Sequence, residues 1–348
     1  MIFVGVQITE LLKKKDAELT SFNGSRLAVD SSLFIYQFLT TIRQRDGTPL
    51  KDSQGRITSH LAGVFSRTTR LMQCGLKLAY VFDGKPPALK RAEQERRSEL
   101  KDKASLNYQA AAEQEDTRAM RKYASQTSRL TPEMVEEVKA LVSALGLPVI
   151  QAPSEAEAQA ALMAKLGDVR AVASQDADVL MFGSPCLVRN LSLVGKRKTS
   201  NRFSYETVKP EEIQLSETLN SLGIDLDQFT ALCMLVGTDY NLGGVKGIGP
   251  KGALKLVKKH KKDFDSLFAE AGWKNCFSLD WKTVFDTIKK IPTTRDYSLD
   301  WSAIDECKVK ELLIETHDFS AERINTTISR LQKEKEKTEQ TGLGTFLQ

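Results

Sequence analysis

Arg26-Leu-Ala-Val-Asp30 contains a short apolar run that ends in an aspartate, and two later stretches repeat this pattern. They are Leu78-Ala-Tyr-Val-Phe-Asp83 and Val169-Arg-Ala-Val-Ala-Ser-Gln-Asp-Ala-Asp178. Apolar runs of this length, bounded by polar or turn residues, are typical of buried strands. In open parallel sheets, binding sites form outside the carboxyl ends of the strands. The three stretches therefore predict a sheet edge at which four aspartates meet.

Further strands and helices are expected around these stretches. Pro148 to Gln151 and Cys186 to Val188 are also short apolar runs, whereas His60 to Gln73 and Pro132 to Leu145 have helical periodicity. Thr131 is the expected N-cap of the second helix, because a proline then occupies the first helical position. This alternation predicts an α/β fold with a mostly parallel central sheet covered by helices on both faces.

The composition favours a reduced protein without a membrane span. No apolar run among the 348 residues has the length of a transmembrane helix. The stretch from Met1 to Glu10 lacks the basic and apolar regions of a signal peptide. The five cysteines are scattered, with no C-x-x-C pair, which argues against a zinc site or a disulfide framework. We therefore expect an intracellular protein with no membrane partner.

Two segments carry concentrated positive charge, although the net charge is only +5. Residues 88–129 are rich in Lys, Arg, Glu, Gln and Ala but poor in large apolar residues, which predicts exposed helices. From composition alone, a solvated helical hairpin is an equally good interpretation. In residues 237–262, a glycine-rich turn leads into a lysine-rich helix. Such turns let backbone N–H groups approach phosphate oxygens, so this segment favours binding to a duplex backbone.

The clustered aspartates need a compensating positive charge. Two carboxylates about 4 Å apart repel by roughly 4 kcal/mol at an effective dielectric of about 20. Oxygen ligands without His or Cys favour magnesium or manganese over zinc. For any single aspartate, a cap or turn role is the better interpretation. Their coincidence at one sheet edge favours a metal site.

Glu155 and Glu157 allow two interpretations. Ser154 and Glu157 fit the capping-box pattern S-x-x-E, and residues two apart on a regular helix do not face one another. Spacing alone therefore favours helix capping. The two glutamates would reach one metal site only from an irregular helix start.

Six stretches, in the same order and over nearly the whole chain, resemble the flap endonucleases. They are Val29-Asp30, Tyr36-Gln-Phe-Leu39, Val81-Phe-Asp-Gly-Lys-Pro-Pro87, Ala152-Pro-Ser-Glu-Ala-Glu-Ala-Gln159, Ser174-Gln-Asp-Ala-Asp178 and Gly237-Thr-Asp-Tyr240 with its glycine turn. Leu242 departs from the proline that is frequent in archaeal members, which would alter only the stiffness of the turn. The resemblance implies a seven-stranded α/β domain of the PIN-like 5′ nuclease fold, with a helical arch and a helix–two-turn–helix motif.

The resemblance also implies roles for individual residues. The metal ligands would be Asp30, Asp83, Glu155, Glu157, Asp176, Asp178 and Asp239, so the two glutamates are ligands rather than caps. Lys90 and Arg97 would be the basic residues at the base of the arch, and Tyr36 the aromatic that stacks on the displaced base. The cofactors would be two magnesium ions, with manganese as the alternative, and potassium at the helix–two-turn–helix motif. The DNA contacts of that motif would be Gly243, Gly244, Lys246, Gly247, Gly249 and Lys251.

A single nuclease domain is expected over residues 1–332, with the arch at 88–129 and the helix–two-turn–helix region at 237–262. Residues 333–348 are expected to be a flexible tail with a box for a sliding clamp (PCNA). The box consists of Gln340, Leu343, Phe346 and Leu347, although an aromatic more often stands at the last position. No basic extension follows the box, which resembles archaeal members. Because relatives typically begin Met-Gly-Val-Gln, the expected start is Val4 rather than Met1.

The resemblance, together with the clustered acids, implies a monomeric, structure-specific 5′ flap endonuclease with 5′–3′ exonuclease activity. It would act on 5′-flap DNA in Okazaki fragment maturation and repair, in the archaeal cytoplasm at the nucleoid. An aspartyl phosphatase fits Asp176 and Asp178 only superficially, because the acids come from too many segments. A non-catalytic junction-binding protein would lack some of the carboxylates. A sibling nuclease for bubbles or four-way junctions would carry a longer spacer or a different arch.

Overall fold

The computed structural model describes residues 6–44, 46–113, 123, 126–193, 195–198 and 205–345. Its centre is a seven-stranded sheet in the order β1-β9-β6-β5-β2-β3-β4. The strands are β1 (Lys14–Asp16), β2 (Arg26–Asp30), β3 (Lys77–Phe82), β4 (Val149–Gln151), β5 (Ala171–Ala173), β6 (Cys186–Arg189) and β9 (Glu211–Gln214). All five strands expected from the sequence are confirmed, and the mixed α/β class with a mostly parallel sheet is confirmed with them.

The register aligns the ends of the three strands that carry aspartates. Val29 of β2 lies opposite Tyr80 of β3 on one side and Ala173 of β5 on the other, and both pairings are parallel. The strands β1 and β9, which pair with each other in antiparallel orientation, were not expected. Their sequences are charged, and Ile213 is the only residue of the two that is buried, so no apolar run marks them.

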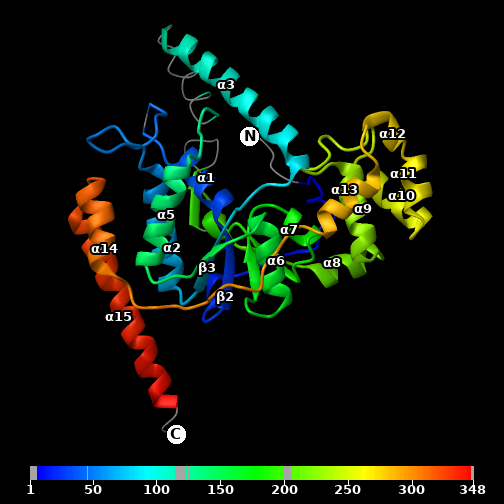
Figure 1. Cartoon of the computed structure of the whole chain (residues 1–348). Coiled ribbons are helices and arrows are strands. Elements are labelled where there is room, and N and C mark those ends of the chain that lie inside the picture. Colours follow the sequence, from blue (N-terminus) through cyan, green and yellow to red (C-terminus); the bar gives the residue numbers. More distant parts are fainter. Residues whose placement is uncertain are drawn as a thin grey trace.

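Helices cover both faces of the sheet (Figure 1). On one face lie α1 (Ser31–Thr41), α2 (Ser59–Gln73), α5 (Pro132–Ala144), α14 (Glu306–Lys310) and α15 (Ala321–Thr345). On the other lie α6 (Ala156–Lys165), α7 (Asp178–Met181), α8 (Leu215–Leu222) and α9 (Leu226–Val236). Leu27 and Val29 enter the first core, whereas Ala28 enters the second. This two-residue period explains why the strand sequences are apolar throughout.

Smaller elements complete the chain. The helices α10 (Pro250–His260), α11 (Phe264–Glu270), α12 (Trp273–Cys276) and α13 (Trp281–Lys289) gather beside α9, and β7 (Gly195–Lys198) pairs with β8 (Tyr205–Val208). Short turns are η1 (Leu19–Phe22), η2 (Ala88–Lys90), η3 (Leu191–Leu193) and the π-helical η4 (Glu311–Thr316). The helix α3 (Arg91–Glu113) projects from the body (Figure 1).

Two helix ends test the local predictions. Thr131 is the N-cap of α5, since its side chain accepts a hydrogen bond from the Met134 amide at 3.3 Å. The expected tail begins at residue 333, but α15 continues through that position to Thr345. Residues 333–340 are mostly Lys, Glu and Gln, which have high helix propensity, and the helix continues through them.

None of the helices in the described ranges is both long and apolar enough to cross a lipid bilayer.

Candidate active site

Four aspartates follow the carboxyl ends of β2, β3 and β5. Asp30 is the last residue of β2 and is 4% exposed, whereas Asp83, just after β3, is exposed. The hydroxyl of Ser174 donates to Asp30 at 3.1 Å and accepts from the backbone N–H of Asp176 at 3.1 Å. Asp178 begins α7 and is buried. The strand ends thus bring these acids to one edge, as the sequence predicted.

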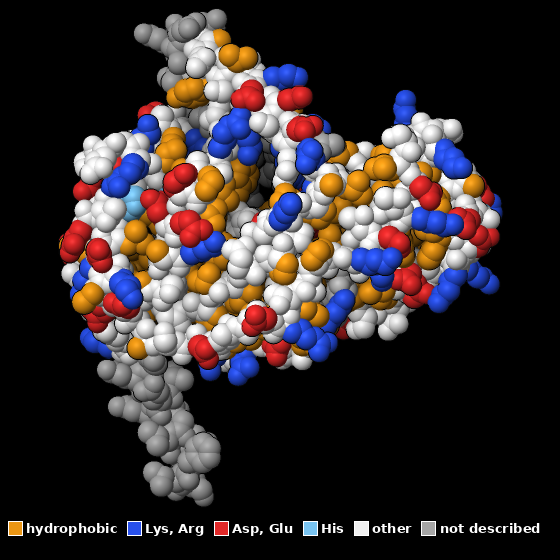
Figure 2. Space-filling model, in the orientation of Figure 1, with side chains coloured by type: hydrophobic (Ala, Val, Ile, Leu, Met, Phe, Trp, Pro, Cys, Tyr) orange, Lys and Arg blue, Asp and Glu red, His pale blue; other side chains and the backbone are white. Residues whose placement is uncertain are grey.

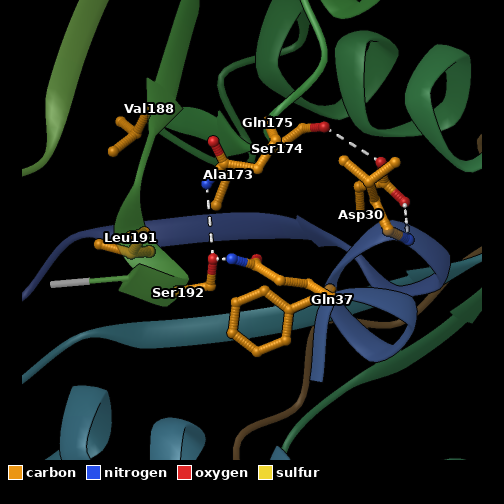
Figure 3. A pocket seen from close by; sticks show the side chains of 10 residues that line it. Asp30, Gln37, Ala173, Ser174, Gln175, Val188, Leu191 and Ser192 are labelled. Carbon is orange, nitrogen blue, oxygen red and sulfur yellow. Dashed lines mark hydrogen bonds between the residues drawn. The ribbon is translucent and has the colours of Figure 1, made fainter. Parts of the chain in front are cut away.

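Figure 3 shows the part of this edge around Asp30. Ser174 lies beside Asp30, and Ser192 lies between Gln175 and Gln37 and is hydrogen-bonded to both. Asp30 also accepts a hydrogen bond from the Leu33 amide at 3.3 Å, which caps α1. The side chains at the end of β2 are therefore held by α1 and by the turns that follow β5 and β6.

Helices α6 and α9 bring the remaining acids. Glu155 precedes α6, Glu157 lies in its first turn, and Asp239 follows α9. The Lys90 ammonium lies 2.7 Å from Glu155 and 3.3 Å from Asp239. Asp239 also accepts from Nη2 of Arg97 at 2.9 Å. The two basic residues that the resemblance singled out therefore contact two of the expected ligands.

The capping interpretation of Glu157 is wrong. Glu155 occupies the N-cap position of α6 without a capping side-chain bond, and the hydroxyl of Ser154 donates to the Lys85 carbonyl at 3.0 Å. The Ala156 amide donates instead to Oδ1 of Asp83 at 2.8 Å. A carboxylate from another segment thus accepts the hydrogen bond of a backbone amide at the start of α6. Neither glutamate is used as a helix cap, so both side chains can take part in the acid cluster.

Burial and mutual repulsion disfavour the charged forms of these acids. Burial and the charge of Asp83 raise the pKa of Asp30 to about 7. Burial and the charge of Asp176 raise the pKa values of Glu157 and Asp178 well above the usual range. Burial alone would lower the pKa of Lys90, but the charges of Glu157, Glu155 and Asp239 outweigh it and raise that pKa. The cluster therefore favours bound protons or cations at neutral pH.

The donor set fits hard divalent cations, because it offers carboxylate oxygens without His or Cys. Among the residues that the structure describes, no group of three His, Cys, Asp or Glu side chains is arranged to hold a metal ion. Lys90 and Arg97 occupy oxygens of Glu155 and Asp239 instead. The acids are thus neutralised in part by the protein's own cations.

Surface features surround this cluster. Figure 2 shows a hollow beneath the base of α3 with Lys and Arg side chains on its rim. Tyr36 on α1 is half-buried, and the ammonium of Lys101 on α3 lies 5.0 Å from its ring centroid. The aromatic side chain of α1 therefore contacts the projecting helix α3.

The glycine turn lies between α9 and α10. Gly243, Gly247 and Gly249 have open space where a Cβ would lie, and Lys246 and Lys251 are exposed. Gly244 differs, because its Cβ would lie 2.3 Å from the carbonyl oxygen of Val236. This glycine is required for packing against α9.

Three residues of the site were not predicted from the sequence. The Tyr240 hydroxyl donates to Glu155, and the Lys90 ammonium lies 5.5 Å from the Tyr240 ring centroid. Ser174 joins two aspartates, and Glu93 pairs with Arg97. Only Glu93 has a readable signal, namely its spacing of three and four residues before two arginines on one helix. The contact of Tyr240 with Glu155 and that of Ser174 with Asp30 are long-range and leave no local pattern.

The expected clamp box is described only in part. Gln340 and Leu343 lie on α15, without described side-chain positions, and Phe346 and Leu347 lie outside the described residues. Val4 and the arch residues 114–122, 124 and 125 also lie outside them.

Comparisons with known proteins agree with this architecture. Residues 6–104 match the XPG N-terminal domain, and residues 146–239 match the XPG I-region. The chain is 49% identical over 333 residues to flap endonuclease 1 of Hyperthermus butylicus, with 95% of each chain covered. It is 48% identical over 330 residues to flap endonuclease 1 of Pyrococcus abyssi, with 95% of this chain and 94% of that protein covered.

Solved structures give the same result. Flap endonuclease-1 from Methanococcus jannaschii matches with a TM-score of 0.74 at 38% identity, covering 95% of this chain and 98% of that one. The catalytic core of Rad2 in complex with a DNA substrate shares the fold, with a TM-score of 0.66 at 23% identity, covering 93% of this chain and 97% of that one. The protein therefore belongs to the flap endonuclease family.

Proposed function

We propose that this protein is a structure-specific 5′ flap endonuclease with 5′–3′ exonuclease activity. It hydrolyses phosphodiester bonds near the base of 5′ flaps in replication, during Okazaki fragment maturation, and in repair. The observation that carries this proposal is the convergence of buried carboxylates from separate segments with Lys90 and Arg97 beneath a projecting helix. Family membership supports it, because the relatives are named flap endonuclease 1.

The acids would hold two magnesium ions, or manganese in their place. Their residues would be Asp30, Asp83, Glu155, Glu157, Asp176, Asp178 and Asp239. Bound metal would supply activated water and stabilisation of the leaving 3′ oxygen. The raised pKa values of Asp30, Glu157 and Asp178 support this assignment, because acids that resist ionisation alone gain most from a bound cation.

The protein's own side chains would orient the substrate and stabilise charge. Lys90 and Arg97 would transfer their contacts from Asp239 and Glu155 to the scissile phosphate. The reacting nucleotide must leave its base pair to reach the acids, which costs a few kcal/mol. Stacking on Tyr36 would offset part of that cost. The segment 88–129 would form the arch through which the single-stranded 5′ end passes.

The glycine turn and α10 would bind the DNA backbone as a helix–two-turn–helix motif, with potassium assisting. Gly243, Gly247 and Gly249 would let phosphates approach backbone N–H groups, because no side chain covers them. Lys246 and Lys251 would add charge, so binding should weaken with salt.

Cleavage of labelled flap, nicked, bubble and four-way DNA, with and without magnesium, tests the function. Flap DNA should be cut fastest, and only with the metal. Asp176→Asn should lower turnover by orders of magnitude and leave flap binding largely intact. Near-normal cleavage by this variant at saturating magnesium would refute the ligand assignment, and a preference for bubbles or four-way junctions would refute the substrate.

The segment 333–348 would dock a sliding clamp (PCNA) through Gln340, Leu343, Phe346 and Leu347, with the enzyme itself a monomer in the cytoplasm. Phe346→Ala should abolish stimulation by the clamp and leave unassisted cleavage unchanged. Equal stimulation of the wild type and Phe346→Ala by the clamp would contradict the docking role.

A further inference from the structure

Glu93 is an acidic residue among the basic side chains that are proposed to contact the scissile phosphate. It lies in the first turn of α3, between Lys90 and Arg97, and is only 3% exposed. Its charge opposes the approach of DNA phosphates. Burying a carboxylate also costs free energy unless it is paired and hydrogen-bonded. A residue with these two disadvantages needs a compensating role, and its contacts indicate one.

Glu93 accepts hydrogen bonds from two neighbouring guanidinium groups. Arg96 donates through Nε at 2.7 Å and through Nη2 at 2.9 Å. Arg97 donates through Nε at 2.5 Å, to Oε1 of Glu93. The same Arg97 uses Nη2 to reach Asp239, at 2.9 Å and 3.1 Å from its two oxygens. Glu93 thus holds one side of the guanidinium while the other side contacts the acid cluster.

We propose that Glu93 is a positioning residue for Arg97, an inference that rests on the proposed action of Arg97 on the scissile phosphate. A guanidinium is a rigid planar fork, so a carboxylate that binds Nε fixes the direction in which the Nη atoms point. Without Glu93, the long arginine stem is free to rotate, and misplacement by about 1 Å costs about 100-fold in rate. Loss of the charge should at the same time favour DNA binding.

A purely structural role makes different predictions. Ion pairs at i, i+3 and i, i+4 stabilise a helix only weakly. If Glu93 only stabilised α3, removing Arg96 would have the same effect as removing Glu93. Binding and cleavage would then also weaken together. If Glu93 positions Arg97, its removal should slow cleavage while DNA binding is kept or improved.

The test combines a double-mutant cycle with separate measurements of binding and single-turnover cleavage of flap DNA. The proteins are the wild type, Glu93→Ala, Glu93→Gln, Arg97→Ala and Glu93→Ala/Arg97→Ala. Glu93→Ala should cleave about 10- to 100-fold more slowly and bind the flap at least as tightly as the wild type. In the Arg97→Ala background it should cause no further loss. Glu93→Gln keeps an oxygen for Nε of Arg97 and should recover part of the rate.

Two control variants lie on the same helix. Glu95 is exposed, so Glu95→Ala removes an equal charge without the contact and should cleave at the normal rate. Arg96→Ala removes the other partner of Glu93 and should have a small effect. Wild-type cleavage by Glu93→Ala, additive losses in the cycle, or an equal loss in Arg96→Ala would each overturn the positioning role. Normal cleavage by Arg97→Ala would refute the proposed action of Arg97 itself, and the inference with it.

Discussion

Replacing Asp30 by asparagine should stabilise the metal-free protein while it removes activity. Asp30 is 4% exposed, and burial with the charge of Asp83 raises its pKa from 3.8 to about 7. At about 1.36 kcal/mol per pKa unit, this rise corresponds to about 4 kcal/mol of destabilisation by the ionised carboxylate. Asparagine has one acceptor oxygen for the two hydrogen bonds from Leu33 and Ser174, a loss of about 1 kcal/mol. The expected net gain is about 3 kcal/mol.

The gain in unfolding free energy of Asp30→Asn over the wild type should increase with pH. In the unfolded chain Asp30 ionises as the pH rises through 3.8, whereas in the folded protein it stays protonated up to about pH 7. The wild type therefore loses stability between about pH 4 and about pH 7, and the loss is constant at higher pH. Asparagine does not titrate. Its advantage should be absent near pH 4 and complete by about pH 8.

Urea denaturation with EDTA, at several values from about pH 4 to about pH 8, measures this difference. Asp296 is exposed, so Asp296→Asn serves as the control and should leave the midpoint unchanged. Magnesium should then stabilise the wild type more than Asp30→Asn, because a ligand stabilises the state that binds it. Equal midpoints of wild type and Asp30→Asn at about pH 8 would refute the reasoning that this acid opposes folding.

Three other substitutions have defined outcomes. Lys90→Ala should slow single-turnover cleavage by about 100- to 1,000-fold with little change in the Kd for flap DNA, because it removes charge stabilisation at the phosphate; a loss confined to binding would contradict this. Gly244→Ala should lower the unfolding midpoint well below that of Gly243→Ala. Both glycines have positive φ, but only at Gly244 would the added Cβ contact backbone, 2.3 Å from the Val236 carbonyl oxygen. Equal midpoints would contradict the packing role. Trp301→Phe should cost about 1–2 kcal/mol in chemical denaturation, because the indole N–H donates to the Leu78 carbonyl at 2.9 Å. Cleavage per folded molecule should be unchanged, since this bond lies near the start of β3, whereas the acids lie at the carboxyl ends of the strands. An unchanged midpoint would argue that the bond adds nothing.

The predictable parts of this protein are those with a local cause. Strands followed directly by aspartate converge because parallel strands end at one edge, and neither step needs knowledge of distant contacts. The start of α6 shows the limit of such reasoning. The S-x-x-E pattern at Ser154 is a sound local signal, but the amide of Ala156 donates its hydrogen bond to Asp83 and not to a side chain of that pattern. A cap supplied from 73 residues away leaves no trace in the spacing.

The position of α3 also could not be predicted from a local pattern, because its sequence has only a weak apolar stripe. Leu100 and Leu106 of this helix are exposed, so hydrophobic contacts of these residues do not hold it. Polar and cation–π contacts join α3 to the body: Arg97 with Asp239, Lys101 with Tyr36, and Asp102 with Arg129. Hydrophobic periodicity predicts where a helix packs only when apolar burial holds it. Here Asp239 pairs with Arg97 at the base of α3, so charge contributes to a placement that the weak apolar pattern does not predict.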